Sequence, residues 1–273
     1  MKVLNKVGTL LAGSTVVAVA AVAGAVSVQA DGYAPKGKAV YERPSNWSGL
    51  YFGVHAGQSW SQIDATFPDG NPAATIVGVA GQGFSVSHSA PIVGGQIGLQ
   101  HQFGQLVLGV EGSASFAFQN NSGVELCPKQ TIALFNCVAR LDDVLTVGAR
   151  AGWSMGKWLP YVTGGYASAR FTEKANNKSL APVATNIIEW QGDRASGWYL
   201  GGGVDVALAH GWTVGLEYRH YDFGTYLGLG SGVVGGLAGG PLPNDNANFS
   251  TTADTLALRV SWKLGRPEPA PLK

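Results

Sequence analysis

Apolar and polar residues alternate along eight stretches of the chain, with the apolar residues recurring at every second position. A period of two places them on one face of a β-strand, whereas a helix would spread them over several faces. The stretches cover about 48–60, 90–103, 105–118, 141–155, 158–171, 195–208, 211–224 and 252–264. The facing of 158–171 is ambiguous, but the pattern predicts strands throughout.

The stretch 211–224, "GWTVGLEYRHYDFG", shows the pattern most clearly. Trp212, Val214, Leu216 and Tyr218 share one predicted face. Glu217 and Arg219 lie on the opposite face, together with small and hydroxylic residues. A soluble β-sandwich would place the apolar face in its core, and a membrane barrel would turn the same face to lipid. The strand alone does not separate these two interpretations.

The connections between the predicted strands separate them. Long polar connections span about 61–88, 119–139, 172–193 and 225–251, and short turns lie around Gly104, Gly156-Lys157 and His210-Gly211. Strict alternation of long and short connections is typical of an up-and-down barrel with loops at one end and turns at the other. Each stretch is long enough for a tilted crossing, which takes about 9–11 residues. The sequence therefore predicts an all-β protein, an eight-stranded antiparallel up-and-down transmembrane β-barrel.

Charged residues fall on the face opposite the apolar one. They are Glu111, Arg150, Asp205, Glu217, Arg219, Arg259 and Lys263. An arginine facing lipid at mid-membrane would cost about 2–4 kcal/mol, and an unpaired charge inside the barrel would also cost several kcal/mol. We therefore expect a mixed-sign network in a lumen that side chains fill. The hypothesised pairs are Glu111 with Arg150 and Glu217 with Arg259.

Tryptophans concentrate at or near the ends of the predicted strands. They are Trp47, Trp60, Trp153, Trp158, Trp198, Trp212 and Trp262. This placement predicts aromatic girdles at the two membrane surfaces. The alternative is aromatic packing in a soluble core, which would not favour strand ends.

Composition agrees with a membrane environment. The formal net charge of +1 gives no indication of nucleic-acid binding, and charged residues form only 13% of a chain that contains 40 glycines. Residues 1–30 have the basic start, apolar run and small-residue ending of a signal peptide, although a retained membrane helix is the alternative. We expect a flexible periplasmic lead-in over 31–46, the barrel over 47–265 and a Pro-rich periplasmic tail over 266–273.

The two cysteines, Cys127 and Cys137, lie close together in one polar connection. In an oxidising compartment such a pair predicts a disulfide that staples the loop. A metal site would need further ligands, and the segment contains no histidine.

Several motifs together resemble one family. They are "NWSGLYFGVHAGQSW", "LPYVTGGYA", "SGWYLGGGVDVALAHGWTVGLEYRHYDFG" and "TLALRVSWKLG". In order and spacing they are similar to the alphaproteobacterial outer-membrane immunogenic surface antigens, which are small OmpA-like porin-family barrels. The resemblance covers about 47–265. It implies a bacterial outer-membrane surface protein with an envelope-integrity role, and it implies loops that meet host or environmental ligands. Outer-membrane lipids, lipopolysaccharide and the barrel-assembly machinery are the implied partners.

The sequence also offers features for two other functions. Hemin binding is suggested by some relatives and by His55, His88, His101, His210 and His220, which are scattered over different segments; a narrow porin-like channel is a variant of this alternative. An enzyme acting on lipid A would need a rim catalyst, for which His220 near Asp222 is the candidate. No serine sits beside it in sequence, and the Gly-rich segment after 225 lacks the ending of a phosphate loop. We therefore expect no enzyme, no metal site and no resident cofactor.

Overall fold

The computed structural model describes residues 45–66, 83–118, 124–126, 135–177, 187–191, 194–233, 240–241 and 247–264. The predicted signal peptide, Cys127 of the predicted disulfide and the C-terminal tail lie outside the described residues, as does the side chain of Cys137. In the described part, no helix is both long and apolar enough to cross a membrane.

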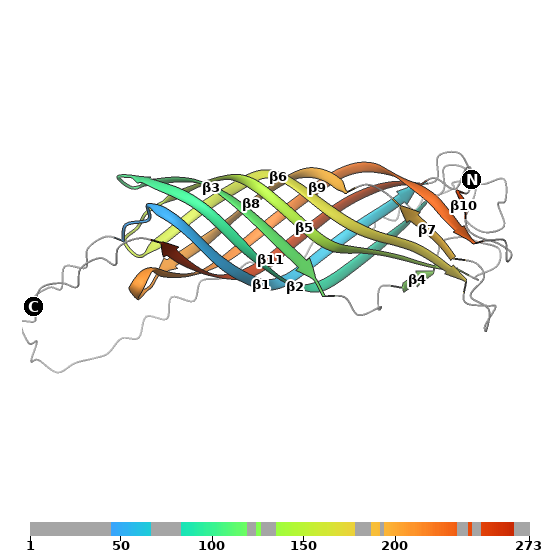
Figure 1. The fold of residues 1–273 in the computed structure, drawn as a ribbon, viewed down its shortest axis with the longest axis horizontal. Helices are drawn as coiled ribbons and strands as arrows, with labels where there is room; N and C mark the ends of the chain where they lie inside the picture. Colours follow the sequence, from blue (N-terminus) through green and yellow to red (C-terminus); the bar gives the residue numbers. More distant parts are fainter. Residues whose placement is uncertain are drawn as a thin grey trace, which may run out of the picture. The chain divides into compact units, whose positions relative to one another are not determined.

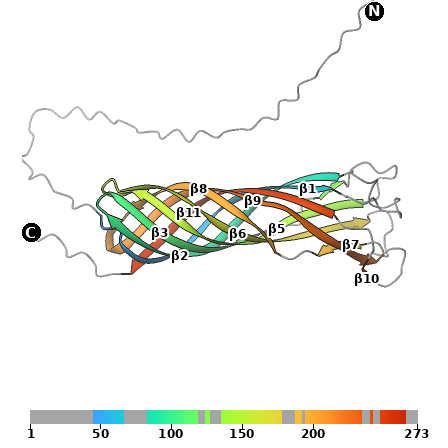
Figure 2. The same cartoon turned by 90° about the horizontal axis from the view of Figure 1, so that it is seen from above.

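Eight long antiparallel strands form the protein (Figures 1 and 2). They are β1 (Gly49–Thr66), β2 (Gly83–Phe103), β3 (Leu106–Ala117), β5 (Phe135–Trp153), β6 (Trp158–Asn177), β8 (Ala195–Ala207), β9 (Trp212–Val233) and β11 (Ala247–Leu264). Each pairs with its neighbours along the chain, and β1 pairs with both β2 and β11. The sheet therefore closes on itself, and the predicted eight-stranded barrel is confirmed.

Short turns join the strands at one end, which we call the turn end. Gly104 and Gly156 have φ of +64° and +67°, a region that residues with a Cβ rarely adopt. The third turn is the 3₁₀ element η1 (Ala209–Gly211), in which His210 itself has φ of +60°. The opposite end, from which the long connections run, is the loop end.

The strands extend further toward the loop end than the hydrophobic pattern predicted. β1 continues to Thr66 and β2 begins at Gly83, inside the stretch expected to be a loop. Three short strands add to this extension: β4 (Val124–Leu126), β7 (Ile187–Gln191) and β10 (Gly240–Pro241). β7 pairs with β6 and β9, the same two strands that flank β8, so β7 and β8 occupy one position in the barrel. The predicted loop boundaries were therefore wrong by several residues.

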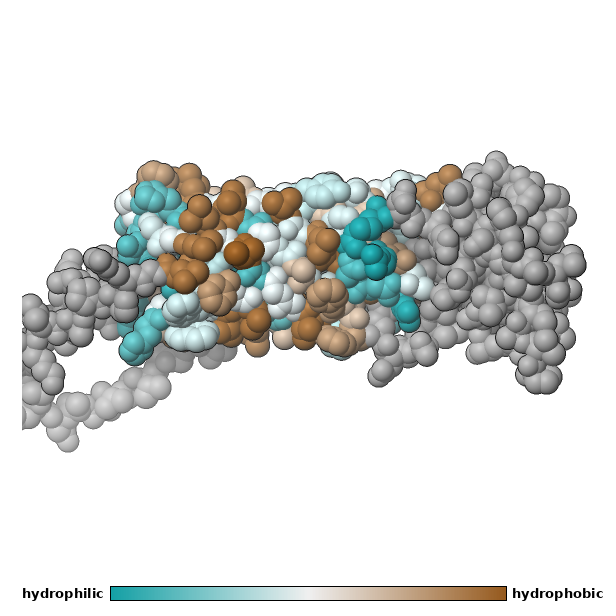
Figure 3. Space-filling view, in the orientation of Figure 1, coloured by the Kyte–Doolittle hydropathy of each residue, from teal (hydrophilic) through white to brown (hydrophobic). Residues whose placement is uncertain are grey.

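Side chains alternate between the outside and the lumen along every long strand. On β8, Leu200 is 59% exposed and its neighbour Tyr199 only 2%. The stretch of ambiguous facing also resolves, since Leu159 and Tyr161 point inward and Val162 outward. The outward apolar residues form a band around the turn-end part of the barrel, visible in brown in Figure 3.

Aromatic side chains mark both edges of this band. Trp158 and Tyr166 lie eight residues apart on β6, both half exposed, and Phe52 and Trp60 have the same spacing on β1. At about 3.4 Å per residue and a tilt near 40°, eight residues correspond to roughly 20 Å of membrane thickness. The band is therefore close in height to the apolar band of outer-membrane barrels, which is about 25 Å tall.

Beyond the band, toward the loop end, the two faces exchange character. Outward positions on β1 become polar, as at Gln62 and Asp64, while the inward Ile63 and Ala65 are buried at 0% and 2% exposure. The inward cluster here consists of Leu141, Val144, Ala167, Ala169, Ala195, Tyr199, Tyr221, Phe223 and Ala253. This loop-end cluster packs like the core of a soluble barrel.

Candidate functional site: the charged lumen and its two ends

Six of the seven predicted lumen charges meet inside the barrel at the level of the apolar band. They are Glu111, Arg150, Asp205, Glu217, Arg219 and Arg259, each no more than 6% exposed. Three are acidic and three basic, so the group is formally neutral. Because buried charges are tolerated only when they are paired and hydrogen-bonded, this balance is what allows the group to exist.

Glu111 on β3 is the centre of the network. Its Oε1 lies 2.6 Å from Nη2 of Arg219, and Arg259 donates to both of its carboxylate oxygens. The Tyr51 hydroxyl donates to Oε2 at 2.6 Å. Arg150, the hypothesised partner, is farther away, with its Nη1 3.8 Å from Oε2. Glu111 therefore neutralises charge mainly from across the lumen, and Arg150 on the adjacent β5 is its more distant partner.

The other two carboxylates divide the remaining guanidinium contacts. Glu217 pairs with Arg259, as hypothesised, and with Arg219, whose Nε lies 2.7 Å from Oε1. Tyr161 donates to Glu217 Oε2 at 2.8 Å. Arg150 pairs more closely with Asp205 on β8, and it also lies within ion-pair distance of Glu111, as hypothesised. Each carboxylate thus receives at least one charge-assisted hydrogen bond, the stronger kind.

Tyrosines that the sequence analysis did not assign complete the network. The guanidinium carbon of Arg150 lies 3.6 Å from the centroid of the Tyr161 ring, and that of Arg219 lies 4.9 Å from Tyr199. Such cation–π stacking stabilises arginine in a desolvated site. The alternation of apolar and polar positions in the sequence could have indicated these tyrosines, because Tyr51 and Tyr161 occupy inward positions next to outward apolar residues.

Glycines on neighbouring strands make room for these rings. A Cβ on Gly98 would lie 2.4 Å from the Tyr51 ring, and one on Gly203 would lie 2.6 Å from the Tyr161 hydroxyl. Real Cβ contacts are never so short, so any side chain at either position would displace the tyrosine. Glycine therefore fixes where the hydroxyl donors sit.

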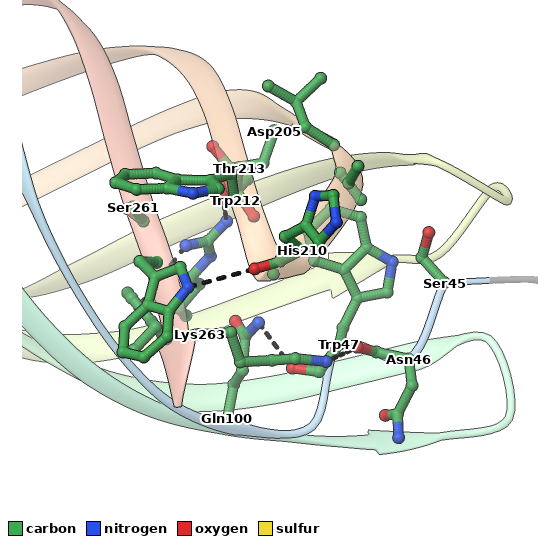
Figure 4. Close-up of a pocket in the computed structure, with 17 residues that line it drawn as sticks. Ser45, Asn46, Trp47, Gln100, Asp205, His210, Trp212, Thr213, Ser261 and Lys263 are labelled. Carbon is green, nitrogen blue, oxygen red and sulfur yellow. Dashed lines mark hydrogen bonds and ion pairs between the residues drawn. The ribbon is translucent and has the colours of Figure 1, made fainter. Parts of the chain in front are cut away.

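Lys263 does not join the network. It lies near the end of β11, and its Nζ donates to the backbone oxygen of Asn46 at the turn-end mouth. Figure 4 shows Lys263 and Asn46 beside a cavity of about 380 Å³, which is also lined by Gln100, Asp205 and His210.

Trp47 was expected in an aromatic girdle, and that expectation was wrong. The residue is 4% exposed and packs inside the mouth against Val107 and Leu159. Gln100 and Gln102 hold it: the Gln100 amide donates to the Trp47 carbonyl at 2.7 Å, and the Trp47 N–H donates to Gln102 Oε1 at 2.9 Å. The segment before β1 thus turns into the barrel, so Trp47 faces the lumen instead of lipid.

The other six girdle candidates lie elsewhere. Five of them are about half exposed on the outside of the barrel: Trp60, Trp153, Trp158, Trp198 and Trp212. Trp262 is less exposed and donates its Nε1–H to the His210 carbonyl at 3.1 Å. On the strands, Trp60 and Trp198 stand toward the loop end, and the rest stand next to the turns.

The histidines lie on different faces of the described barrel. His55 is in the lumen, bonded to Gln96 and Ser115 at 2.8 Å each, whereas His101 and His210 are exposed near the turns. No group of three or more metal-ligating side chains occurs among the described residues.

His220 near Asp222 was the candidate rim catalyst of the enzyme hypothesis. His220 Nδ1 lies 2.8 Å from Asp254 on the neighbouring β11. The Asp222 carboxylate accepts from the Gly224 N–H at 2.8 Å, within a local bulge of β9. The two side chains therefore have different hydrogen-bond partners, Asp254 for His220 and the Gly224 N–H for Asp222.

A closed barrel with an apolar outer band, aromatic edges and a neutralised ionic lumen is a transmembrane β-barrel. The chain belongs to the family described as outer membrane protein beta-barrel domain, whose sequence profile matches residues 16–263. The predicted family resemblance and the outer-membrane location are thereby confirmed.

Several individual proteins are similar to this chain. The 31 kDa outer-membrane immunogenic protein of Brucella melitensis is 28% identical over 66% of this chain and 72% of its own length. Among solved structures, OprG from Pseudomonas aeruginosa is 12% identical, with coverage of 79% of this chain and 97% of OprG and a TM-score of 0.41. Neisserial surface protein A is 14% identical, with coverage of 80% and 98% and a TM-score of 0.34.

Proposed function

We propose that this protein is a non-conducting, non-enzymatic surface barrel that contributes to envelope integrity and presents its long loops to host or environmental ligands. The observation that carries the proposal is the filling of the lumen at three successive levels. Trp47 lies in the turn-end mouth beside the cavity there, the ionic network occupies the middle, and the loop-end cluster occupies the described lumen beyond the band. A protein that transports solutes would need an open path through these levels.

The rigid support of the loops favours a presenting role. The strands continue past the apolar band as an ordered barrel with its own apolar interior, so the long connections start well above the lipid. Loops placed by a rigid scaffold commonly carry recognition. Assembly of such a closed barrel is proposed to use the barrel-assembly machinery, with β11 closing against β1.

Conductance in planar bilayers tests the closed lumen. The wild-type protein is expected to give no discrete current steps, and Trp47→Ala is expected to stay silent too, because the ionic network lies behind it. Discrete steps from the wild type would overturn the proposal in favour of a narrow channel.

A gene-deletion strain tests the envelope role. It is expected to become sensitive to detergent with chelator and to recover on expression of the wild type. Expression of a variant with residues 234–246 replaced by a short Gly-Ser linker is expected to restore resistance but to lose binding to loop ligands. A deletion strain with unchanged resistance would rule out the envelope role. Titration with hemin, followed by its Soret band, tests the alternative.

A further inference from the structure

Charged side chains gather on the outer surface immediately beyond the loop-end edge of the apolar band. On β6 the outward residue Tyr166 is followed by Ser168 and then Arg170, whereas Ala167 and Ala169 between them are fully buried. Arg140 lies on the flanking strand β5, and Arg194 lies just before the other flanking strand, β8. In Figure 3 a strongly hydrophilic patch lies on this side of the brown band. The three arginines therefore stand at the depth of lipid headgroups.

One arginine of the three is structural. Arg194 donates through Nη2 to Asp143 and to the Ser168 carbonyl at 3.0 Å, and through Nε to the Ser168 hydroxyl at 3.1 Å. These bonds connect three neighbouring strands. They lie where β8 begins, after the end of β7 in the sequence, so Arg194 ties the start of β8 to β5 and β6.

The other two arginines are held more loosely. Arg140 Nε lies 3.2 Å from Asp142, and Arg170 Nε lies 3.8 Å from Asp143, with the Arg170 side chain 64% exposed. A register shift of β5 against β6 between Leu141 and Asp143 gives both aspartates a place in the cluster. Among the side chains that the structure describes here, two carboxylates face three guanidiniums, which gives a formal charge of +1.

The opposite side of the barrel has the reverse charge at this level. The described outward residues of β1, β9 and β11 include Asp64, Asp222 and Asp254, and His220 lies beside Asp254. None of the described outward residues of these three strands is a lysine or an arginine. The excess of positive charge is therefore confined to the side formed by β5, β6 and β8.

We propose that Arg140 and Arg170, positioned by Asp142, Asp143 and Arg194, bind a phosphate group of an outer-leaflet glycolipid whose acyl chains lie along the apolar band. Guanidinium groups match phosphate oxygens through paired hydrogen bonds and bind them more strongly than neutral donors do. The band edge at Tyr166 and Trp198 lies directly below, so acyl chains and phosphate would be engaged together. The proposal rests on the loop end facing the cell exterior, as the family assignment implies.

The test measures lipid retention by the full-length protein purified in a neutral detergent. Bisphosphorylated lipid A is the probe, its dephosphorylated form is the control lipid, and native mass spectrometry counts bound molecules. Arg140→Gln with Arg170→Gln is expected to reduce apparent affinity for the bisphosphorylated probe about tenfold. Arg140→Lys with Arg170→Lys is expected to retain much of this affinity, because Lys keeps the positive charge. It should not retain all of it, because Lys lacks the paired hydrogen-bond geometry of Arg.

Two controls make the result decisive. Asp64→Asn, on the acidic side, is expected to leave retention unchanged. Mobility of unboiled protein on gels reports that each variant is a closed barrel, and a silent bilayer recording reports that the proposed closed lumen is intact, independently of lipid binding. The proposal would be overturned if the wild type retained the two lipid forms equally. It would also be overturned if the Gln variant retained the bisphosphorylated probe as well as the wild type does. Binding that disappears on addition of a chelator would instead assign the phosphate contact to a bridging divalent cation and would equally overturn it.

Discussion

The two halves of this barrel solve the same packing problem with opposite chemistry. In the membrane half, the outward residues are apolar and the lumen holds six charged side chains. In the loop-end half, the outward residues are polar and the lumen holds a cluster of aromatic and aliphatic side chains. β1, β2, β5, β6, β9 and β11 run through both halves. The difference shows that the solvent outside decides which face is apolar, while strand pairing is indifferent to it.

The two lumens also differ in what holds them. In the ionic half, stability depends on charge balance, because removing one partner leaves an uncompensated buried charge. In the apolar half, it depends on volume, because removing a side chain leaves a cavity. Substitutions in the two halves should therefore lower the stability of the protein by different mechanisms. Unfolding by denaturant in lipid vesicles measures the change in the free energy of unfolding for each.

The largest effect is expected from Glu111→Gln. The change preserves the shape but removes the carboxylate that neutralises Arg219 and Arg259. The free energy of unfolding should fall by about 3–5 kcal/mol. Adding Arg259→Gln to restore neutrality should recover part of the loss, and the exposed Asp64→Asn should change stability by less than about 0.5 kcal/mol. A loss at Glu111 no greater than at Asp64 would show that the network is not balanced as described.

Ile63→Ala should cost about 2–4 kcal/mol, because the side chain is fully buried in the loop-end half and leaves a cavity. Its outward neighbour provides the matched control. Gln62→Ala should alter unfolding by less than about 0.5 kcal/mol. Equal costs at the two positions would mean that the loop-end lumen is not a packed core.

The same substitution at two outward positions of β1 should separate the halves. Val54→Arg places a charge in the apolar band and should destabilise the protein by about 2–4 kcal/mol. Gln62→Arg places it just beyond the band edge, at the depth of lipid headgroups, and should be nearly neutral. Each variant is folded in vesicles, gel mobility reports whether the barrel has closed, and unfolding curves give the loss in free energy of unfolding. Similar losses at the two positions would mean that the apolar part of the membrane extends beyond Gln62.

The smallest effect is expected at Gly224, where β9 bulges against β11 between the two halves. Its φ is +60°, and a Cβ there would meet no atom within 4 Å. Gly224→Ala should therefore cost about 1–2 kcal/mol through backbone conformation alone. Gly224→Asn should cost less than Ala, since Asn adopts this region more readily; the opposite order would indicate a packing role instead.

The period of two was sufficient to predict the membrane half from sequence. Outward positions such as Leu200 and Val147 sit in unbroken apolar series, and the turns fall at Gly104 and Gly156. The loop-end half was missed because its outward residues are polar, as loops usually are. The alternation persists there, with Ile63 and Ala65 between Gln62 and Asp64, but with its meaning reversed.

Only part of the pairing in the lumen could be read from neighbouring strands: Glu217 on β9 pairs with Arg259 on β11 as hypothesised, but the shortest contacts of Glu111 and Arg150 do not follow strand order. Glu111 on β3 binds Arg259 on β11, although β2 and β1 lie between them in the sheet. Arg150 on β5 likewise reaches Asp205 on β8 across β6. Long side chains in a narrow lumen meet across its width, which the order of strands does not reveal. Trp47 was misplaced for a related reason, because the chain before the first strand turns inward without a hydrophobic repeat.

Nitroxide labels at Val54 and Asp64 test the central claim most directly, since both positions face outward on the same strand. Each label would be attached to a single cysteine in a background with Cys127 and Cys137 replaced by serine, and its relaxation by dissolved oxygen and by a water-soluble nickel chelate would be compared. The exchange of faces predicts that oxygen dominates at Val54 and the chelate at Asp64. Chelate dominance at Val54, or oxygen dominance at both positions, would contradict it.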